Sequence, residues 1–163
     1  MNKAEITIQD RPVVAAAGLK AEVTGAPAAA IELPDGRVVT GKTSDLMGAS
    51  SAMLLNALKV LAGVDDAYDL IAPSVIEPIQ KLKVEHLGNH NPHMHIGETL
   101  IALTISSATD PEARKALDQL GNLKGCEMHS TVILSPVDEN TCRKLKVNLT
   151  CEPKYQTAKL FHN

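Results

Sequence analysis

The stretch that decides the fold is AAAIELPDGRVVTGK, residues 28–42. Two short apolar runs flank Pro34-Asp35-Gly36, a combination that is typical of a tight β turn. We therefore expect a hairpin with strands near Ala29–Leu33 and Arg37–Gly41. This is the only pair of strands joined tightly enough to be expected antiparallel.

Helices and strands alternate on both sides of this hairpin. Capping and turn residues predict a helix over Arg11–Thr24 before it and a helix from Ser44 or Asp45 to Gly63 after it. The other expected elements are a strand at Tyr68–Ala72, a helix from Ser74 to about His86, a helix over TLIALTISSAT, a helix from Asp110 to Gly121, a strand over EMHSTVILS, a helix over PVDENTCRKL and a strand over KVNLTCE.

This order predicts an α/β fold, because strands that alternate with helices form a sheet covered on both faces. We expect a mixed five-stranded sheet in three α/β/α layers. The order resembles the cytidine-deaminase-like core, here without its zinc motifs. One domain is expected over residues 1–163, with a core at about 10–152 and a tail at 153–163.

Composition narrows the classes of partner. The chain has no Trp and three other aromatic residues, so its core must pack Ala, Val, Ile, Leu and Met, and it lacks a stacking platform for nucleic acid. A net charge of −3 gives no electrostatic attraction to nucleic acid or anionic membranes. No apolar run is long enough to span a bilayer. The three cysteines lack CxxC spacing, so we expect neither a disulfide framework nor a zinc ribbon, and a cytoplasmic location.

Several long motifs resemble one bacterial family. They are GAPAAAIELPDGRVVTGKTSDLMGASSAMLLNALK, VIEPIQ, GCEMHSTVILSPVDENTCRKL and NLTCEPKY. Together they resemble the C-terminal domain of the Domain of Unknown Function 1846 family (uncharacterised protein family 0371), from about Asp10 to the end of the chain. The resemblance implies a fold but no mechanism. Members of that family are about three times longer, so the chain is expected to be an excised domain or a separately encoded module.

The segment Gly36–Thr43 matches the pattern G-x-x-x-x-G-K-[ST] of a phosphate-binding loop. Its four central residues, Arg37 to Thr40, instead indicate a strand whose amides are committed to a sheet. Nucleotide binding of the P-loop type is therefore a remote alternative.

A simpler anion site is expected immediately afterwards. Lys42, Thr43 and Ser44 lead into a helix start, where free amides and the helix dipole attract an anion. In the deaminase-like core this helix start lines the functional cleft. The alternative is that Ser44 only caps the helix and Lys42 is a solvated surface charge.

The densest polar cluster consists of four histidines and one acid, His86, His90, His93, His95 and Glu98, and Asn91 lies within the same stretch. Neither HExxH nor a pair of H-x-E and P-C-x-x-C motifs occurs, so the ligand spacing of zinc deaminases is missing. The resembled family shares the N-P-x-x-H pattern that ends in His95. We expect a catalytic or substrate-binding His95 with Asn91 and Glu98 nearby, no metal and no cofactor. A metal site and a solvated loop remain alternatives.

A second cluster lies on the strand over EMHSTVILS. Alternation places Cys126, Met128 and Ser130 on one face and His129 on the other. Neighbours on a strand point apart, so a local Cys–His or Ser–His dyad is not expected. Cys126 is expected to be a small buried residue, and His129 either faces His95 across the cleft or is a structural residue of the sheet.

These features lead to two hypotheses. The first is a small-molecule enzyme domain whose cleft binds an anionic ligand, with His95 and His129 transferring protons and Lys42, Thr43, Ser44, Asn91, Glu98 and Ser130 binding the substrate. The second is a non-catalytic assembly or ligand-sensing module that completes a larger protein, such as the N-terminal domains of the resembled family. We expect a homo-oligomer in either case, because exposed apolar helices favour partners.

Overall fold

The computed structural model describes residues 11–88 and 91–153. Its elements follow in the order α1 (Pro12–Thr24), β1 (Ala28–Glu32), β2 (Val38–Lys42), α2 (Ala49–Ala62), α3 (Pro73–Lys81), the π-helix η3 (Leu82–His86), α4 (Ile96–Ser107), α5 (Pro111–Leu117), the 3₁₀-helix η4 (Leu120–Leu123), β3 (Glu127–Ser130), α6 (Pro136–Leu145) and β4 (Asn148–Cys151).

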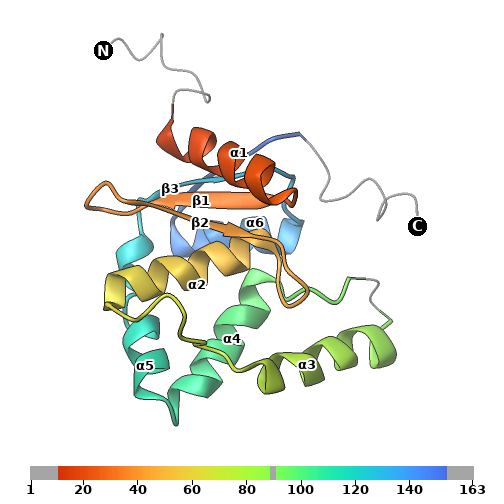
Figure 1. Cartoon of the computed structure of the whole chain (residues 1–163). Helices are drawn as coiled ribbons and strands as arrows, with labels where there is room; N and C mark the ends of the chain where they lie inside the picture. The colour runs from red at the N-terminus through yellow and green to blue at the C-terminus, as the bar shows by residue number, and fades with distance from the viewer. Residues whose placement is uncertain (1–10, 89–90, 154–163) are drawn as a thin grey trace.

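The sheet is mixed and carries helices on both faces, as expected for an α/β fold. The described residues form four strands in the order β2-β1-β3-β4, rather than the five predicted. β1 pairs antiparallel with both β2 and β3, whereas β3 and β4 are parallel. The prediction of a single antiparallel pair is therefore wrong, because β3 returns beside β1 after four intervening helices. Figure 1 shows α1 over one face and α2 and α6 on the other.

The hairpin forms where the turn signal predicted it. Gly36 has a positive φ of 91°, and the Asp35 carboxylate accepts a hydrogen bond from the Arg37 amide (3.0 Å). Val38 to Lys42 pair residue by residue with β1. Most of the segment that matches a phosphate-binding loop is therefore a strand. Its backbone is paired in the sheet and does not wrap around a phosphate.

The segment Tyr68–Ala72 is a bend and not the predicted fifth strand. Leu70 and Ile71 are buried, so the apolar run correctly indicates contact with the core although it forms no strand. The segment packs beside α2 and towards α5, where the Tyr68 hydroxyl donates to Asp110 (2.7 Å). It pairs with none of the described strands.

Helix α2 begins at Ala49, four or five residues later than the predicted start at Ser44 or Asp45. The Ser44 hydroxyl accepts hydrogen bonds from the Leu46 and Met47 amides, which forms a turn instead of a helix cap. Met47 then forms an isolated parallel bridge with Met94. This pairing takes up the backbone of the connection, and Gly48 becomes the N-cap residue of α2.

The core is aliphatic, as the composition predicted. Among its largest fully buried side chains are Ile31, Met53, Leu58 and Met128. Cys126 is 5% exposed and is a small buried residue as expected. The ambiguous stretch over TLIALTISSAT lies in helix α4. No helix in the described ranges is long and apolar enough to cross a bilayer.

Helix α2 approaches the sheet very closely at Gly41 of β2. A Cβ atom at Gly41 would lie 2.6 Å from the Met53 Cα atom and 2.8 Å from the Ala52 carbonyl carbon. Both are backbone atoms of α2 and cannot rotate away. Helix α2 therefore packs directly on β2 only because residue 41 has no side chain.

We predict that Gly41→Ala lowers the free energy of unfolding by about 1–3 kcal/mol or more, because the helix must move off the sheet. Urea denaturation measures this change. Gly18→Ala in α1 is the matched control: nothing lies within 4 Å of its Cβ position, so the variant should gain about 0.5–1 kcal/mol. Equal effects of the two substitutions would contradict the close-contact interpretation.

Candidate functional site

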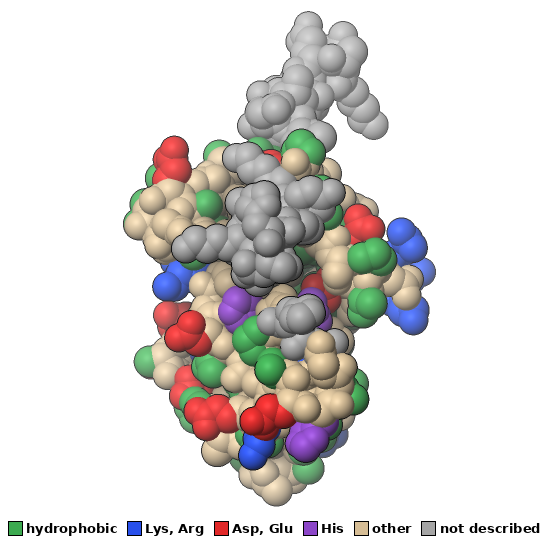
Figure 2. Space-filling view, turned by 90° about the vertical axis from the view of Figure 1, so that its right-hand side faces the viewer, with side chains coloured by type: hydrophobic (Ala, Val, Ile, Leu, Met, Phe, Trp, Pro, Cys, Tyr) green, Lys and Arg blue, Asp and Glu red, His purple; other side chains and the backbone are tan. Residues whose placement is uncertain are grey.

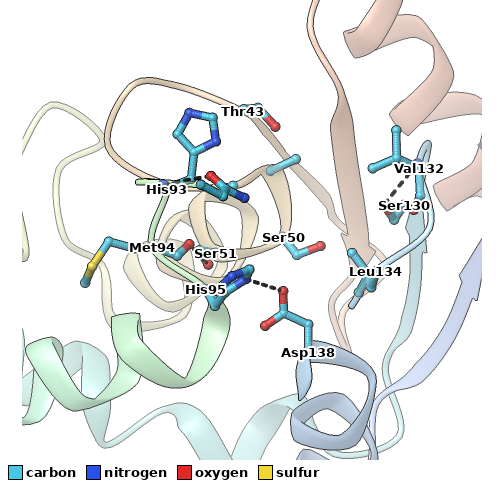
Figure 3. Close-up of a pocket in the computed structure, with 13 residues that line it drawn as sticks. Thr43, Ser50, Ser51, His93, Met94, His95, Ser130, Val132, Leu134 and Asp138 are labelled. Carbon is cyan, nitrogen blue, oxygen red and sulfur yellow. Dashed lines mark hydrogen bonds and ion pairs between the residues drawn. The ribbon is translucent and has the colours of Figure 1, made fainter. Parts of the chain in front are cut away.

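Three helices begin around one small pocket. The first turns of α2 and α6, the residue before α4 and the ends of β2 and β3 all contribute to its wall. The pocket has a volume of about 30 Å³, and its lining residues are Thr43, Gly48, Ala49, Ser50, Ser51, Asn91, His93, Met94, His95, Ser130, Val132, Leu134 and Asp138 (Figure 3). Three positive helix ends therefore meet at a polar cavity.

Two of these helix starts are satisfied by side chains. The Ser135 hydroxyl caps α6 by accepting from the Asp138 amide (3.2 Å). Asp138 in turn accepts from the Ile96 amide at the start of α4 (3.0 Å). Helix α2 differs, because its N-cap is Gly48 and no side chain caps it. Its first-turn amides remain available to a ligand.

Two buried hydroxyls beside this uncapped start also lack partners. The Ser50 Oγ and Thr43 Oγ1 atoms are buried and make no hydrogen bond within the described residues. Ser50 as a whole is only 4% exposed. In Figure 3 its hydroxyl points into the space between Thr43 and the His95–Asp138 pair. Because an unpaired buried hydroxyl costs about 1–3 kcal/mol, a polar ligand is the natural partner for both groups.

His95 and Asp138 form the titratable pair of the pocket. The His95 Nδ1 atom lies 3.2 Å from Asp138 Oδ2, with 36% of the histidine and 10% of the aspartate side chain exposed. The hydrogen bond to Asp138 raises the pKa of His95 above its usual 6.5, although partial burial and Lys83 oppose this. Figure 2 shows histidine side chains reaching the surface in the middle of one face. The pair suits proton exchange, because Asp138 holds Nδ1 and Nε2 makes no hydrogen bond to the described residues.

A buried ion pair supports His95 from behind. The Lys83 side chain, 3% exposed, donates to Glu98 Oε1 (2.9 Å) and to the His93 carbonyl. The same Glu98 oxygen accepts from the His95 amide (2.8 Å). Lys83 lies in the π-helix η3, a rare element often found near functional sites. These bonds hold the backbone that positions the histidine.

The structure brings together only part of the predicted site. Thr43, Asn91, His95 and Ser130 line the pocket. Glu98 lies behind His95 rather than in the lining. Lys42, at the exposed end of β2, and Ser44 line a separate groove beside α2 and do not reach the pocket.

His129 does not face His95, which corrects one of the two expected orientations. It is fully buried and bonds Thr150 Oγ1 (2.7 Å) and Glu152 Oε2 (3.1 Å). Alternation along β3 puts Ser130 in the pocket, so its neighbour His129 must point to the opposite face. There Arg11, which precedes α1, also bonds Thr150 (2.7 Å).

The sequence analysis missed two residues that matter most, Ser50 and Asp138. The signal available for both was their place in a helix first turn. The sequence does not show that these two first turns lie side by side in the fold, because many residues separate them along the chain.

Metal ligands do not converge in the residues that the structure covers. No group of three or more histidine, cysteine or acidic side chains there could hold an ion. The His93 ring points away from the His95–Asp138 pair in Figure 3, and burial lowers its pKa below the usual value. Metal-free chemistry stays a prediction.

Comparison with known proteins confirms the resemblance that the motifs indicated. Residues 9–161 match the family model described as "Domain of unknown function DUF1846, C-terminal". A UPF0371 protein of Corynebacterium glutamicum (strain R) is 57% identical over 161 residues, which cover 99% of this chain and 32% of that protein. One from Streptococcus pyogenes serotype M5 is 53% identical over 161 residues, 99% of this chain and 33% of that protein. The chain, which spans about a third of the length of these relatives, therefore belongs to the DUF1846 (UPF0371) family and matches its C-terminal domain.

Proposed function

We propose that this domain binds the anionic group of a small molecule in the pocket at the start of α2 and exchanges a proton with it through His95. The observation that carries the proposal is the unpartnered, buried Ser50 hydroxyl at an uncapped helix start, beside the His95–Asp138 pair. An anion would satisfy both the hydroxyl and the first-turn amides.

The histidine supplies the chemistry in this proposal. Asp138 accepts from Nδ1 and leaves Nε2 to act on the ligand as acid or base. Protonation of His95 would add a positive charge to the wall that binds the anion. The resemblance in element order to a cytidine-deaminase-like core supports the location, because the corresponding helix start lines the cleft there. The proposal also includes a cytoplasmic location and a reaction that requires no zinc.

An assembly module is the second candidate. Ile101 and Ile105 on α4 are 64% and 63% exposed and lie one helical turn apart. Leu19 and Val23 on α1 are similarly exposed. An assembly contact, with a second copy or with the rest of a longer protein, would cover such faces. This role does not require the pocket to be catalytic.

The anion site is tested by NMR titration of the whole chain with phosphate, sulfate and acetate. We expect binding of at least one of these anions to saturate. It should shift the NMR signals of the Ala49 to Ser51 amides and of the His95 ring. Ser50→Ala should weaken binding about 3- to 10-fold through loss of one hydrogen bond. It should not destabilise the free protein, because the buried hydroxyl has no partner to lose.

Ser74→Ala is the matched control for Ser50→Ala, since Ser74 is exposed at the equivalent second position of α3. Affinity should not change in this variant. Shifts scattered over the surface without saturation, or unchanged affinity in Ser50→Ala, would contradict the anion site.

The His95–Asp138 pair makes a prediction about pH. Because folding raises the pKa of His95, the pair stabilises the fold fully below about 6.5, and this contribution is lost as pH rises through the folded-state pKa. Asp138→Asn should lower the His95 pKa, measured from its ring proton shifts. Glu139→Gln removes a neighbouring exposed charge and should change the pKa far less. Equal pKa values in the wild type and Asp138→Asn would refute the assigned cause.

Self-association tests the assembly role. Sedimentation velocity at micromolar concentration should show a dimer or larger species for the wild type. Replacing Ile101 and Ile105 with Glu should shift it towards monomer, because charges in an apolar contact are costly. Asn140→Glu, an exposed change on α6, is the control. A wild type that stays at 17.3 kDa at every concentration excludes the association.

A further inference from the structure

We infer that the pocket selects a tetrahedral oxyanion that still carries a hydroxyl hydrogen, and that Asp138 makes this selection. Inorganic phosphate and a protonated phosphate monoester have this chemistry, whereas sulfate and carboxylates at neutral pH do not. The inference rests on the proposed function, because it names the anion that the pocket takes.

The donors of the pocket come from separate directions. Thr43 follows the end of β2, Ser50 lies in the first turn of α2, and His95 precedes α4. Figure 3 shows the Thr43 and Ser50 hydroxyls and the His95 ring on different sides of the space. A group whose oxygens point to the corners of a tetrahedron fits this arrangement better than the two coplanar oxygens of a carboxylate.

Asp138 adds an acceptor to this set of donors. One of its oxygens accepts from the Ile96 amide (3.0 Å), and the other lies 3.2 Å from His95 Nδ1. A carboxylate oxygen has two lone pairs, so each oxygen keeps capacity for one further bond. Its side chain is only 10% exposed, so water screens the charge weakly.

This acceptor discriminates between anions of the same shape. Sulfate would bring a like charge against Asp138 with no hydrogen to place between the oxygens, and like-charge contacts in a confined site are costly. Phosphate near neutral pH retains a hydrogen and can donate it to the carboxylate. A repulsion is thereby replaced with a charge-assisted hydrogen bond.

The size of the pocket limits what else enters. A volume of about 30 Å³ admits one small polar group and not a whole metabolite. The organic part of a monoester would therefore lie outside, on the open side of the pocket. His95, 36% exposed, borders that side and can reach the ester oxygen or a phosphate oxygen.

The experiment compares phosphate with sulfate on the whole chain near neutral pH, by isothermal calorimetry and NMR. We expect the wild type to bind phosphate at least about tenfold more tightly than sulfate, as one charge-assisted hydrogen bond implies. Asp138→Asn should bring the two affinities together, chiefly because sulfate binds better. Asparagine keeps an oxygen that accepts from the Ile96 amide, and Glu139→Gln should leave the preference unchanged.

Each outcome has a definite meaning. Equal affinities of the wild type for phosphate and sulfate would overturn the proposed selection but not the proposed anion site. If binding of neither anion saturates, the selection and the anion site are both overturned. A preference that persists in folded Asp138→Asn would remove Asp138 from the selection. If that variant does not fold, the wild-type ratio alone decides. Methyl phosphate and phosphate are also compared at about pH 5, where both carry a hydroxyl hydrogen. Similar affinities support an ester as the ligand, and a weaker affinity for methyl phosphate supports free phosphate.

Discussion

The contact between Gly41 and the backbone of α2 is the constraint on which the site depends. Because the Met53 and Ala52 backbone lies where a Cβ atom of residue 41 would be, the helix can lie this close to β2 only at a residue without a side chain. That placement determines where the first turn of α2 ends up. Ser50 is three residues before Met53, so a shift of the helix would move its hydroxyl out of the pocket.

Asp138 joins the second and third helix starts in a comparable way. One carboxylate accepts from the first amide of α4 and orients the histidine that precedes it, while its own amide is held by Ser135. A single negative charge thus serves two positive helix ends. Since both ends are satisfied by protein groups, the remaining unsatisfied end belongs to α2. This asymmetry between the three helices is the reason for placing the proposed anion at the start of α2.

Local signals predicted the elements well and their pairing poorly. Pro34-Asp35-Gly36 placed the hairpin correctly, because a tight turn needs no distant partner. Tyr68–Ala72 was misassigned, since apolar residues can be buried without pairing in a sheet, as Leu70 and Ile71 are beside α2. The start of α2 was placed too early because the bridge between Met47 and Met94, which are far apart in the chain, takes up the intervening backbone.

The same limit applies to the site. His95 was found because a histidine in a polar turn before a helix is a local signal. The alternation along β3 correctly separated His129 from Ser130, but it cannot say which face meets the cleft; the packing of α1 and α6 decides that. The sequence does not identify Asp138 as the partner of His95, because 43 residues separate the two along the chain. First-turn residues therefore form much of the proposed site, and only the fold could show which first turns converge.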